Sequence, residues 1–104
     1  MSIITERIPV CELLAGLAEE AAELAQAALK LRRCYDGTNP TPADADIQYE
    51  RFLEEIGDVE LYLDQLSINR MVIEDYKAAK LERWVKRLES LKQCKGFCGR
   101  DGNE

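Results

Sequence analysis

The sequence LAEEAAELAQA, residues 17–27, decides the fold of the first part of the chain and carries the first of two acidic motifs. Its apolar residues continue a stripe with helical spacing, made of Val10, Leu13, Leu14, Leu17, Ala21, Leu24, Ala28 and Leu31. This spacing predicts an amphipathic helix from about residue 9 to residue 34, with Pro9 in its first turn. Alanine fills many of the other positions, which gives a slim helix that can pack on more than one neighbour.

The acidic residues of this stretch follow a pattern that a second stretch repeats. Glu20 and Glu23 lie three residues apart, as do Glu55 and Asp58 in the sequence FLEEIGDV, residues 52–59. A spacing of three places two carboxylates on one face of a helix, one turn apart, where like charges repel. Because the pattern occurs on two separate helices, we expect the four carboxylates to share a cation. Oxygen ligands suit Mg²⁺, with Mn²⁺ as a substitute.

The two motifs also match in how they lie relative to the apolar stripes of their helices. An α-helix rotates by about 100° per residue, and this rotation places each residue around the helix axis. In each Glu pair the second member, Glu20 or Glu55, then lies beside the apolar stripe. The first member, Glu19 or Glu54, faces away from it and is expected to be solvated. One such motif alone is most simply an ordinary charged helix face. Two motifs with the same arrangement and no interspersed lysine favour a metal site.

The rest of the chain is also helical in pattern. Residues 35–45 contain turn formers and two prolines, which predicts a loop. A second helix is predicted from about residue 45 to 66 and a third from about 72 to 92, with a short break at 67–70. One face of the third helix is basic, with Lys77, Lys80, Arg83, Lys86 and Arg87.

These elements predict an all-α fold in a single domain, residues 1–104, with a helical core at about 9–93 and a flexible tail at 95–104. Three long helices plus short elements would form a four-helix core, completed by an extra short helix or by a partner subunit. The broad apolar face of the first helix predicts a homodimer or homotetramer. Gly57 is expected to let two helices approach closely.

Composition excludes several classes of function. The chain has 14 Lys and Arg against 20 Asp and Glu, a net charge of −6, which argues against binding nucleic acid or an anionic membrane. The absence of histidine excludes Ser-His-Asp and Cys-His catalysis and His-containing zinc sites. No apolar run reaches the roughly 18 residues of a membrane span, and the N-terminus lacks a signal-peptide pattern, so a cytoplasmic protein is expected.

The four cysteines are then expected to be reduced. Cys11 and Cys34 lie near opposite ends of the first predicted helix, roughly 34 Å apart, and cannot share a site. Cys94 and Cys98 could meet each other, but two cysteines do not make a tetrahedral zinc site, and their role stays open.

The two acidic motifs resemble those of the all-α nucleoside triphosphate pyrophosphohydrolase superfamily, above all its short MazG-like members. By that resemblance Glu20, Glu23, Glu55 and Asp58 correspond to Mg²⁺-binding, catalytic carboxylates. The family's later helix carries basic residues that face the substrate phosphates, and Lys80 and Arg83, with Lys77 as a neighbour, match them loosely. Trp84, where some members have Asn, and the long linker between the motifs leave the preferred nucleotide open.

The resemblance implies a Mg²⁺-dependent enzyme that hydrolyses nucleoside triphosphates to the monophosphate and pyrophosphate. Tyr62 lies one turn after Asp58 and either stacks on the base or packs in the core or at an interface. Two other functions stay open. One is a non-catalytic bundle of the same fold that binds nucleotide or regulates a partner. The other is a plain helical oligomerisation module, which would bind no metal.

Overall fold

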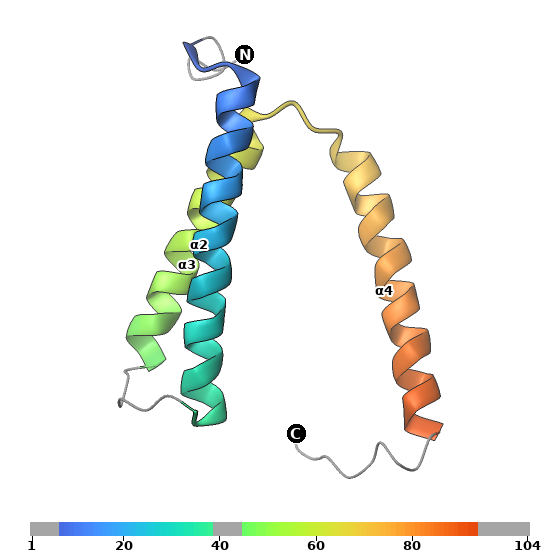
Figure 1. The fold of residues 1–104 in the computed structure, drawn as a ribbon. Helices are drawn as coiled ribbons and strands as arrows, with labels where there is room; N and C mark the ends of the chain where they lie inside the picture. The colour runs from blue at the N-terminus through green and yellow to red at the C-terminus, as the bar shows by residue number, and fades with distance from the viewer. Residues whose placement is uncertain (1–6, 39–44, 94–104) are drawn as a thin grey trace. The chain divides into compact units, whose positions relative to one another are not determined.

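The computed structural model describes residues 7–38 and 45–93 of the 104-residue chain. These residues form three helices and no strand: α2 (Val10–Asp36), α3 (Ala45–Gln65) and α4 (Arg70–Gln93) (Figure 1). The predicted all-α class is therefore confirmed, and each predicted helix is found within about two residues of its expected ends. The four-helix core remains a prediction.

The ends of α2 follow from its local sequence. The carbonyl oxygen of Pro9 accepts hydrogen bonds from the N–H groups of Glu12 (3.0 Å) and Leu13 (3.1 Å). Pro9 itself is extended, with ψ 153°, so it lies just before the first turn rather than inside it as predicted. At the other end Gly37 adopts the left-handed conformation that commonly ends helices, with φ 77°. The side chain of Asp36 accepts bonds from the N–H and hydroxyl groups of Thr38 beyond it.

α4 begins two residues earlier than expected because Asn69 caps it. The side-chain oxygen of Asn69 accepts a hydrogen bond from the N–H of Val72 (3.2 Å), and its carbonyl oxygen accepts one from Ile73 (3.2 Å). Both bonds satisfy donors that the first turn of a helix leaves without partners.

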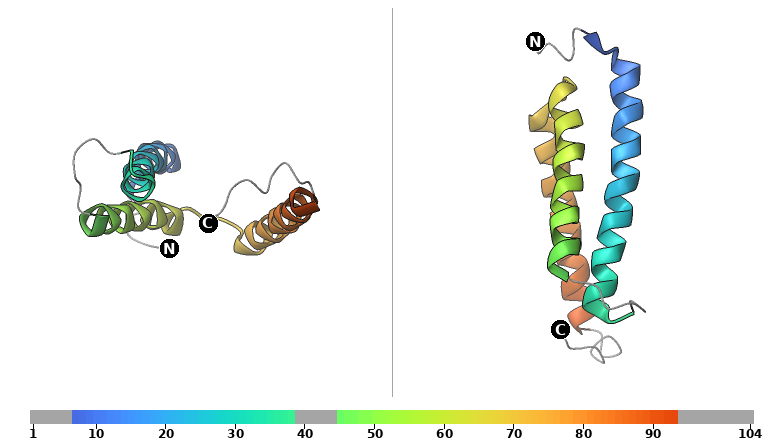
Figure 2. Two further views of the ribbon diagram at one scale, coloured as in Figure 1. Left: turned by 90° about the horizontal axis from the view of Figure 1, so that it is seen from below. Right: turned by 90° about the vertical axis from the view of Figure 1, so that its left-hand side faces the viewer.

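α2 and α3 pack side by side and antiparallel, as both views of Figure 2 show. Leu13 is 1% exposed, and Ala27 and Leu31 are also buried, all three on α2. The two helices lie close together at Gly16, where a Cβ atom would overlap the ring of Tyr62. A Cβ atom added at Gly57 would meet nothing within 4 Å in the described parts of the chain, so Gly57 is not a close contact between α2 and α3.

The chain divides into two compact units, residues 1–68 and 69–104. The first unit contains α2 and α3, and the second contains α4. Within residues 7–38 and 45–93, no helix is both long and apolar enough to cross a membrane. The predicted tail, Cys94, Cys98 and most of the linker between α2 and α3 lie outside the described residues.

The α2–α3 pair leaves much of its apolar surface exposed. Leu14, which belongs to the predicted apolar stripe of the first helix, is 51% exposed, and Leu53 on α3 is 41% exposed. The other large apolar side chains exposed on these two helices are Val10, Leu29, Tyr35, Ile47, Tyr49 and Leu61. Burying such side chains stabilises a fold by about 1.5–3 kcal/mol each, so this surface is well suited to a further packing partner.

Candidate metal centre

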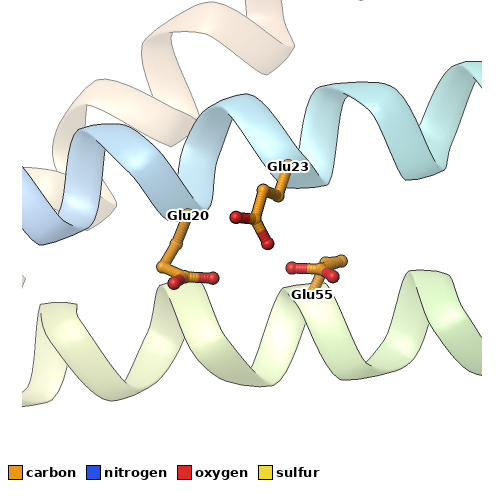
Figure 3. Close-up of side chains that lie close together, drawn as sticks. All are labelled: Glu20, Glu23 and Glu55. Carbon is orange, nitrogen blue, oxygen red and sulfur yellow. The ribbon is translucent and has the colours of Figure 1, made fainter.

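The acidic residues of α2 and α3 converge in the space between the two helices. Oxygens of the Glu20, Glu23 and Glu55 carboxylates all lie within 4.8 Å of one another. Figure 3 shows Glu20 and Glu23 extending from α2 toward Glu55, which extends from α3 toward them. Glu20 and Glu55 are half-buried, whereas Glu23 is exposed. Three carboxylates at this separation are within the span that one cation can bridge.

Asp58 joins this group through Glu20. The negative charge of Asp58 is among those that raise the pKa values of Glu20 and Glu55, while the group of described carboxylates with oxygens within 4.8 Å of one another consists of Glu20, Glu23 and Glu55. Hereafter the four residues Glu20, Glu23, Glu55 and Asp58 are called the acidic cluster. Its two pairs lie one turn apart, so the carboxylates of each motif face those of the other.

The antiparallel register of α2 and α3 explains this arrangement. From Gly16 the chain steps forward by four residues to Glu20. From Tyr62, which faces Gly16, it steps back by four residues to Asp58, which faces Glu20. The next step of three residues brings Glu23 opposite Glu55. Equal steps on antiparallel helices keep one face in contact, and therefore the matching spacing of the two motifs pairs their carboxylates.

The charges of the acidic cluster disturb one another. The pKa of Glu20 is raised first by loss of hydration and then by the negative charges of Glu23, Asp58 and Glu55. The pKa of Glu55 is raised by loss of hydration and by the charges of Glu23, Asp58 and Glu54.

Two oxygens of the acidic cluster lack partners. Oε1 of Glu20 and Oε1 of Glu55 are inaccessible to solvent, and no residue in the described parts of the chain donates a hydrogen bond to either. A buried carboxylate oxygen without a partner costs free energy, and bound cations are one way in which proteins compensate it. Together with the all-oxygen donor set, these orphaned atoms fit Mg²⁺ better than a softer metal.

The other members of the two Glu pairs lie where the helical pattern places them. Glu19 and Glu54 are exposed, while Glu20 and Glu55 are half-buried. Tyr62 is half-buried against Gly16 and helps to line an apolar pocket of about 180 Å³ with Leu13 and Leu61. In this structure the Tyr62 ring is thus part of the α2–α3 contact.

The predicted phosphate-binding residues all lie on α4, in the second unit. Lys77 forms an ion pair with Glu74 (3.2 Å), and the Lys80 ammonium lies 5.9 Å from the centre of the Trp84 ring. Arg83 is exposed. The Lys77–Glu74 and Lys80–Trp84 contacts both lie within α4.

The structure shows two basic residues beside the acidic cluster that the sequence analysis did not single out. Lys30 and Arg51 line a groove between α2 and α3 that also includes Glu23 and Glu55. The signal was present in the spacing, because Lys30 follows Glu23 by seven residues and Arg51 precedes Glu55 by four. Both intervals keep a side chain on the same helix face.

Comparison with known proteins found no family model, no curated protein and no solved structure that matches this chain. The resemblance to the all-α pyrophosphohydrolases therefore rests on the two acidic motifs themselves.

Proposed function

We propose that this chain is a Mg²⁺-dependent nucleoside triphosphate pyrophosphohydrolase. The observation that carries the proposal is the convergence of paired carboxylates from α2 and α3, with two solvent-inaccessible oxygens left without hydrogen bonds. A helical pair selected only for stability would separate these charges or pair them with lysine and arginine.

The acidic cluster supplies the metal ligands in this proposal. Glu20, Glu23, Glu55 and Asp58 hold Mg²⁺, or Mn²⁺ in its place, through carboxylate oxygens. When bound, Mg²⁺ neutralises negative charge on the triphosphate and polarises the phosphorus that is attacked. The half-buried position of Glu20 and Glu55 fixes these ligands between two helices, which limits their freedom to reorient.

The reaction uses water as the nucleophile. A carboxylate of the acidic cluster accepts a hydrogen bond from the water and takes up its proton. The water oxygen forms a bond to the α-phosphorus, and the bond between that phosphorus and the oxygen that bridges to the β-phosphorus breaks. The products are a nucleoside monophosphate and pyrophosphate. Lys77, Lys80 and Arg83 of α4 are proposed to contact the phosphates, and Tyr62 is a candidate contact for the base.

The proposed assembly is a homodimer or homotetramer. Leu14, Leu53 and the other exposed apolar side chains of α2 and α3 support it, because a second copy would remove them from water. Sedimentation at micromolar concentration should show a species larger than the 11.8 kDa chain. A stable, monodisperse monomer would count against the oligomer and leave the metal site untouched.

The function is tested with a panel of standard and modified nucleoside triphosphates, in which pyrophosphate release is measured with and without Mg²⁺. We expect Mg²⁺-dependent release from at least one of them. Glu20→Gln should lower that rate about 100-fold or more, since a catalytic metal contributes several kcal/mol. Glu19→Gln removes the same charge from an exposed neighbour and serves as the control.

The two other functions give different results in these assays. A non-catalytic protein of the same fold would bind Mg²⁺ and nucleotide without releasing pyrophosphate. An oligomerisation module would show no Mg²⁺ binding by isothermal titration.

A further inference from the structure

A polar groove runs between α2 and α3 directly beside the acidic cluster. Its volume is about 310 Å³. Its polar lining consists of Glu23, Gln26 and Lys30 from α2 and of Gln48, Arg51 and Glu55 from α3. Glu23 and Glu55 belong to both the groove and the acidic cluster. A ligand bound at the acidic cluster can therefore extend into the polar groove without leaving the α2–α3 pair.

The groove continues the helix register that pairs the carboxylates. Seven residues after Glu23 the chain reaches Lys30, and seven residues before Glu55 it reaches Gln48. Helical side chains tilt toward the N-terminus of their helix, so Lys30 leans toward the turn that carries Glu23. Arg51 lies one turn from Glu55 on the same face of α3. Two carboxylates are thus followed by two basic side chains along one groove.

The charges of this groove are suited to an anion held next to a cation. Arg51 is the one basic residue of α3, and Lys30 is one of three on α2. Neither forms an ion pair with another residue in the parts of the chain that the structure describes. Arg32, by contrast, pairs with Asp36 outside the groove. The side-chain amides of Gln26 and Gln48 add neutral hydrogen-bond donors.

We infer that the polar groove is the subsite for the two phosphates that leave as pyrophosphate. This inference rests on the proposed function, because it takes the α-phosphate to lie at the acidic cluster. Lys30 and Arg51 donate charge-assisted hydrogen bonds to the β- and γ-phosphate oxygens. They stabilise the negative charge that the leaving pyrophosphate gains as the bridging bond breaks. By this inference, basic side chains of the first unit contact the substrate phosphates. The resemblance to the pyrophosphohydrolases had placed such basic contacts only on α4.

The test uses inorganic pyrophosphate as the ligand, because binding can then be measured without turnover. Pyrophosphate is titrated calorimetrically into the full chain in the presence of Mg²⁺. Lys30→Gln and Arg51→Gln should each raise the dissociation constant about tenfold, as expected for loss of a charge-assisted contact. Arg32→Gln removes the same charge from the same helix and should leave binding within about twofold. Mg²⁺ titrations without pyrophosphate should show no weaker metal binding in any of the three variants.

The result separates this subsite from the proposed function. If Lys30→Gln and Arg51→Gln bind pyrophosphate as the wild type does, the subsite is wrong, whether or not nucleotides are hydrolysed. Failure of the wild type to bind pyrophosphate with Mg²⁺ overturns it as well. If pyrophosphate binding depends on Lys30 and Arg51 but no nucleoside triphosphate is hydrolysed, the groove binds pyrophosphate as inferred, but the proposed activity falls and with it the role of the groove in holding a leaving group. Thermal melts of the variants should match the wild type, since both side chains are exposed.

Discussion

Glu23 on α2 faces Glu55 on α3, and oxygens of their two carboxyl groups lie within 4.8 Å of each other. Loss of hydration and the negative charge of Glu23 raise the pKa of Glu55, so in the metal-free protein the Glu55 carboxyl group keeps its proton to a higher pH than an isolated glutamate does. Loss of hydration and the charges of neighbouring carboxylates raise the pKa of Glu20, one turn away, in the same way. The metal-free cluster is therefore a source of strain that either protons or a cation can relieve.

The first prediction concerns stability against pH without metal. The folded-state pKa values of Glu20 and Glu55 are raised above the ordinary glutamate value, first by loss of hydration and then by neighbouring charges. A raised carboxyl pKa means that the folded state binds protons more tightly, so the contribution of these groups to stability decreases as pH rises from about 4.5 through the raised values. Urea melts of the metal-free protein across this range should show that decrease.

Glu55→Gln should flatten this pH dependence and should not lower stability at pH 7, because it removes one of the repelling charges. Glu19→Gln is the control, since Glu19 is exposed and does not contribute to either pKa shift. Equal pH profiles for Glu55→Gln and the wild type would contradict the account of the cluster.

The second prediction links Mg²⁺ binding to pH. Bound Mg²⁺ requires ionised carboxylates, so binding should release protons and weaken as pH falls toward 5. Mg²⁺ at 100 times its dissociation constant should stabilise the fold by about 2.7 kcal/mol at pH 7.5. Thermal melts with and without Mg²⁺, at pH 7.5 and at pH 5, measure the stabilisation that Mg²⁺ produces. A Mg²⁺-induced shift that is equal at both, or that persists in Glu20→Gln, would contradict the assigned ligands.

The third prediction concerns the helix contact that sets the register. Gly16→Ala places a Cβ atom against the ring of Tyr62 and should destabilise the fold by about 1–3 kcal/mol, as overpacking does. Gly57→Ala is a matched control in α3, where a Cβ atom meets nothing. It should be neutral or stabilise by up to about 1 kcal/mol through helix propensity. Chemical denaturation of both variants measures the difference, and equal effects would show that Gly16 is not a close contact.

The outline of the fold was predictable because α2 and α3 carry strong periodic patterns between clear breaks. The apolar stripe that includes Leu13 and Leu31 predicted the first helix. The turn formers that follow Asp36 predicted the loop, and together they placed the ends of α2 within about two residues of those observed. The capping of α4 by Asn69 was not predicted. It depends on a hydrogen bond from the Val72 N–H to the Asn69 side chain, and the spacing of apolar residues does not indicate such a bond.

The site was predictable only in part. The motif spacing indicated which carboxylates share a face, but the pairing of Glu20 with Asp58 depends on the register of two helices, which Gly16 and Tyr62 fix. Lys30 and Arg51 were overlooked because isolated basic residues on helix faces are common. Their position beside Glu23 and Glu55 becomes visible only when α2 and α3 are brought together.

The fourth prediction concerns the basic face of α4. If Lys80 and Arg83 contact the phosphates, then Lys80→Ala and Arg83→Ala should lower turnover about tenfold with little change in metal-free stability, because the contact exists only with substrate bound. Lys86→Ala is the control, since Lys86 pairs with Glu82 on the same helix. Wild-type turnover in both variants would refute the role. Lower stability together with altered metal affinity would instead indicate resting ion pairs with the acidic cluster.

The central claim is that water attacks the α-phosphorus at a Mg²⁺ site made by Glu20, Glu23, Glu55 and Asp58. The most direct measurement is hydrolysis of the best nucleoside triphosphate of the panel in ¹⁸O-labelled water, with the products analysed by ³¹P NMR. The account predicts that the label appears in the nucleoside monophosphate, that pyrophosphate stays unlabelled, and that Glu20→Gln forms both products at least about 100-fold more slowly. Label in pyrophosphate or orthophosphate, or no Mg²⁺-dependent hydrolysis of any nucleotide by the wild type, would contradict it.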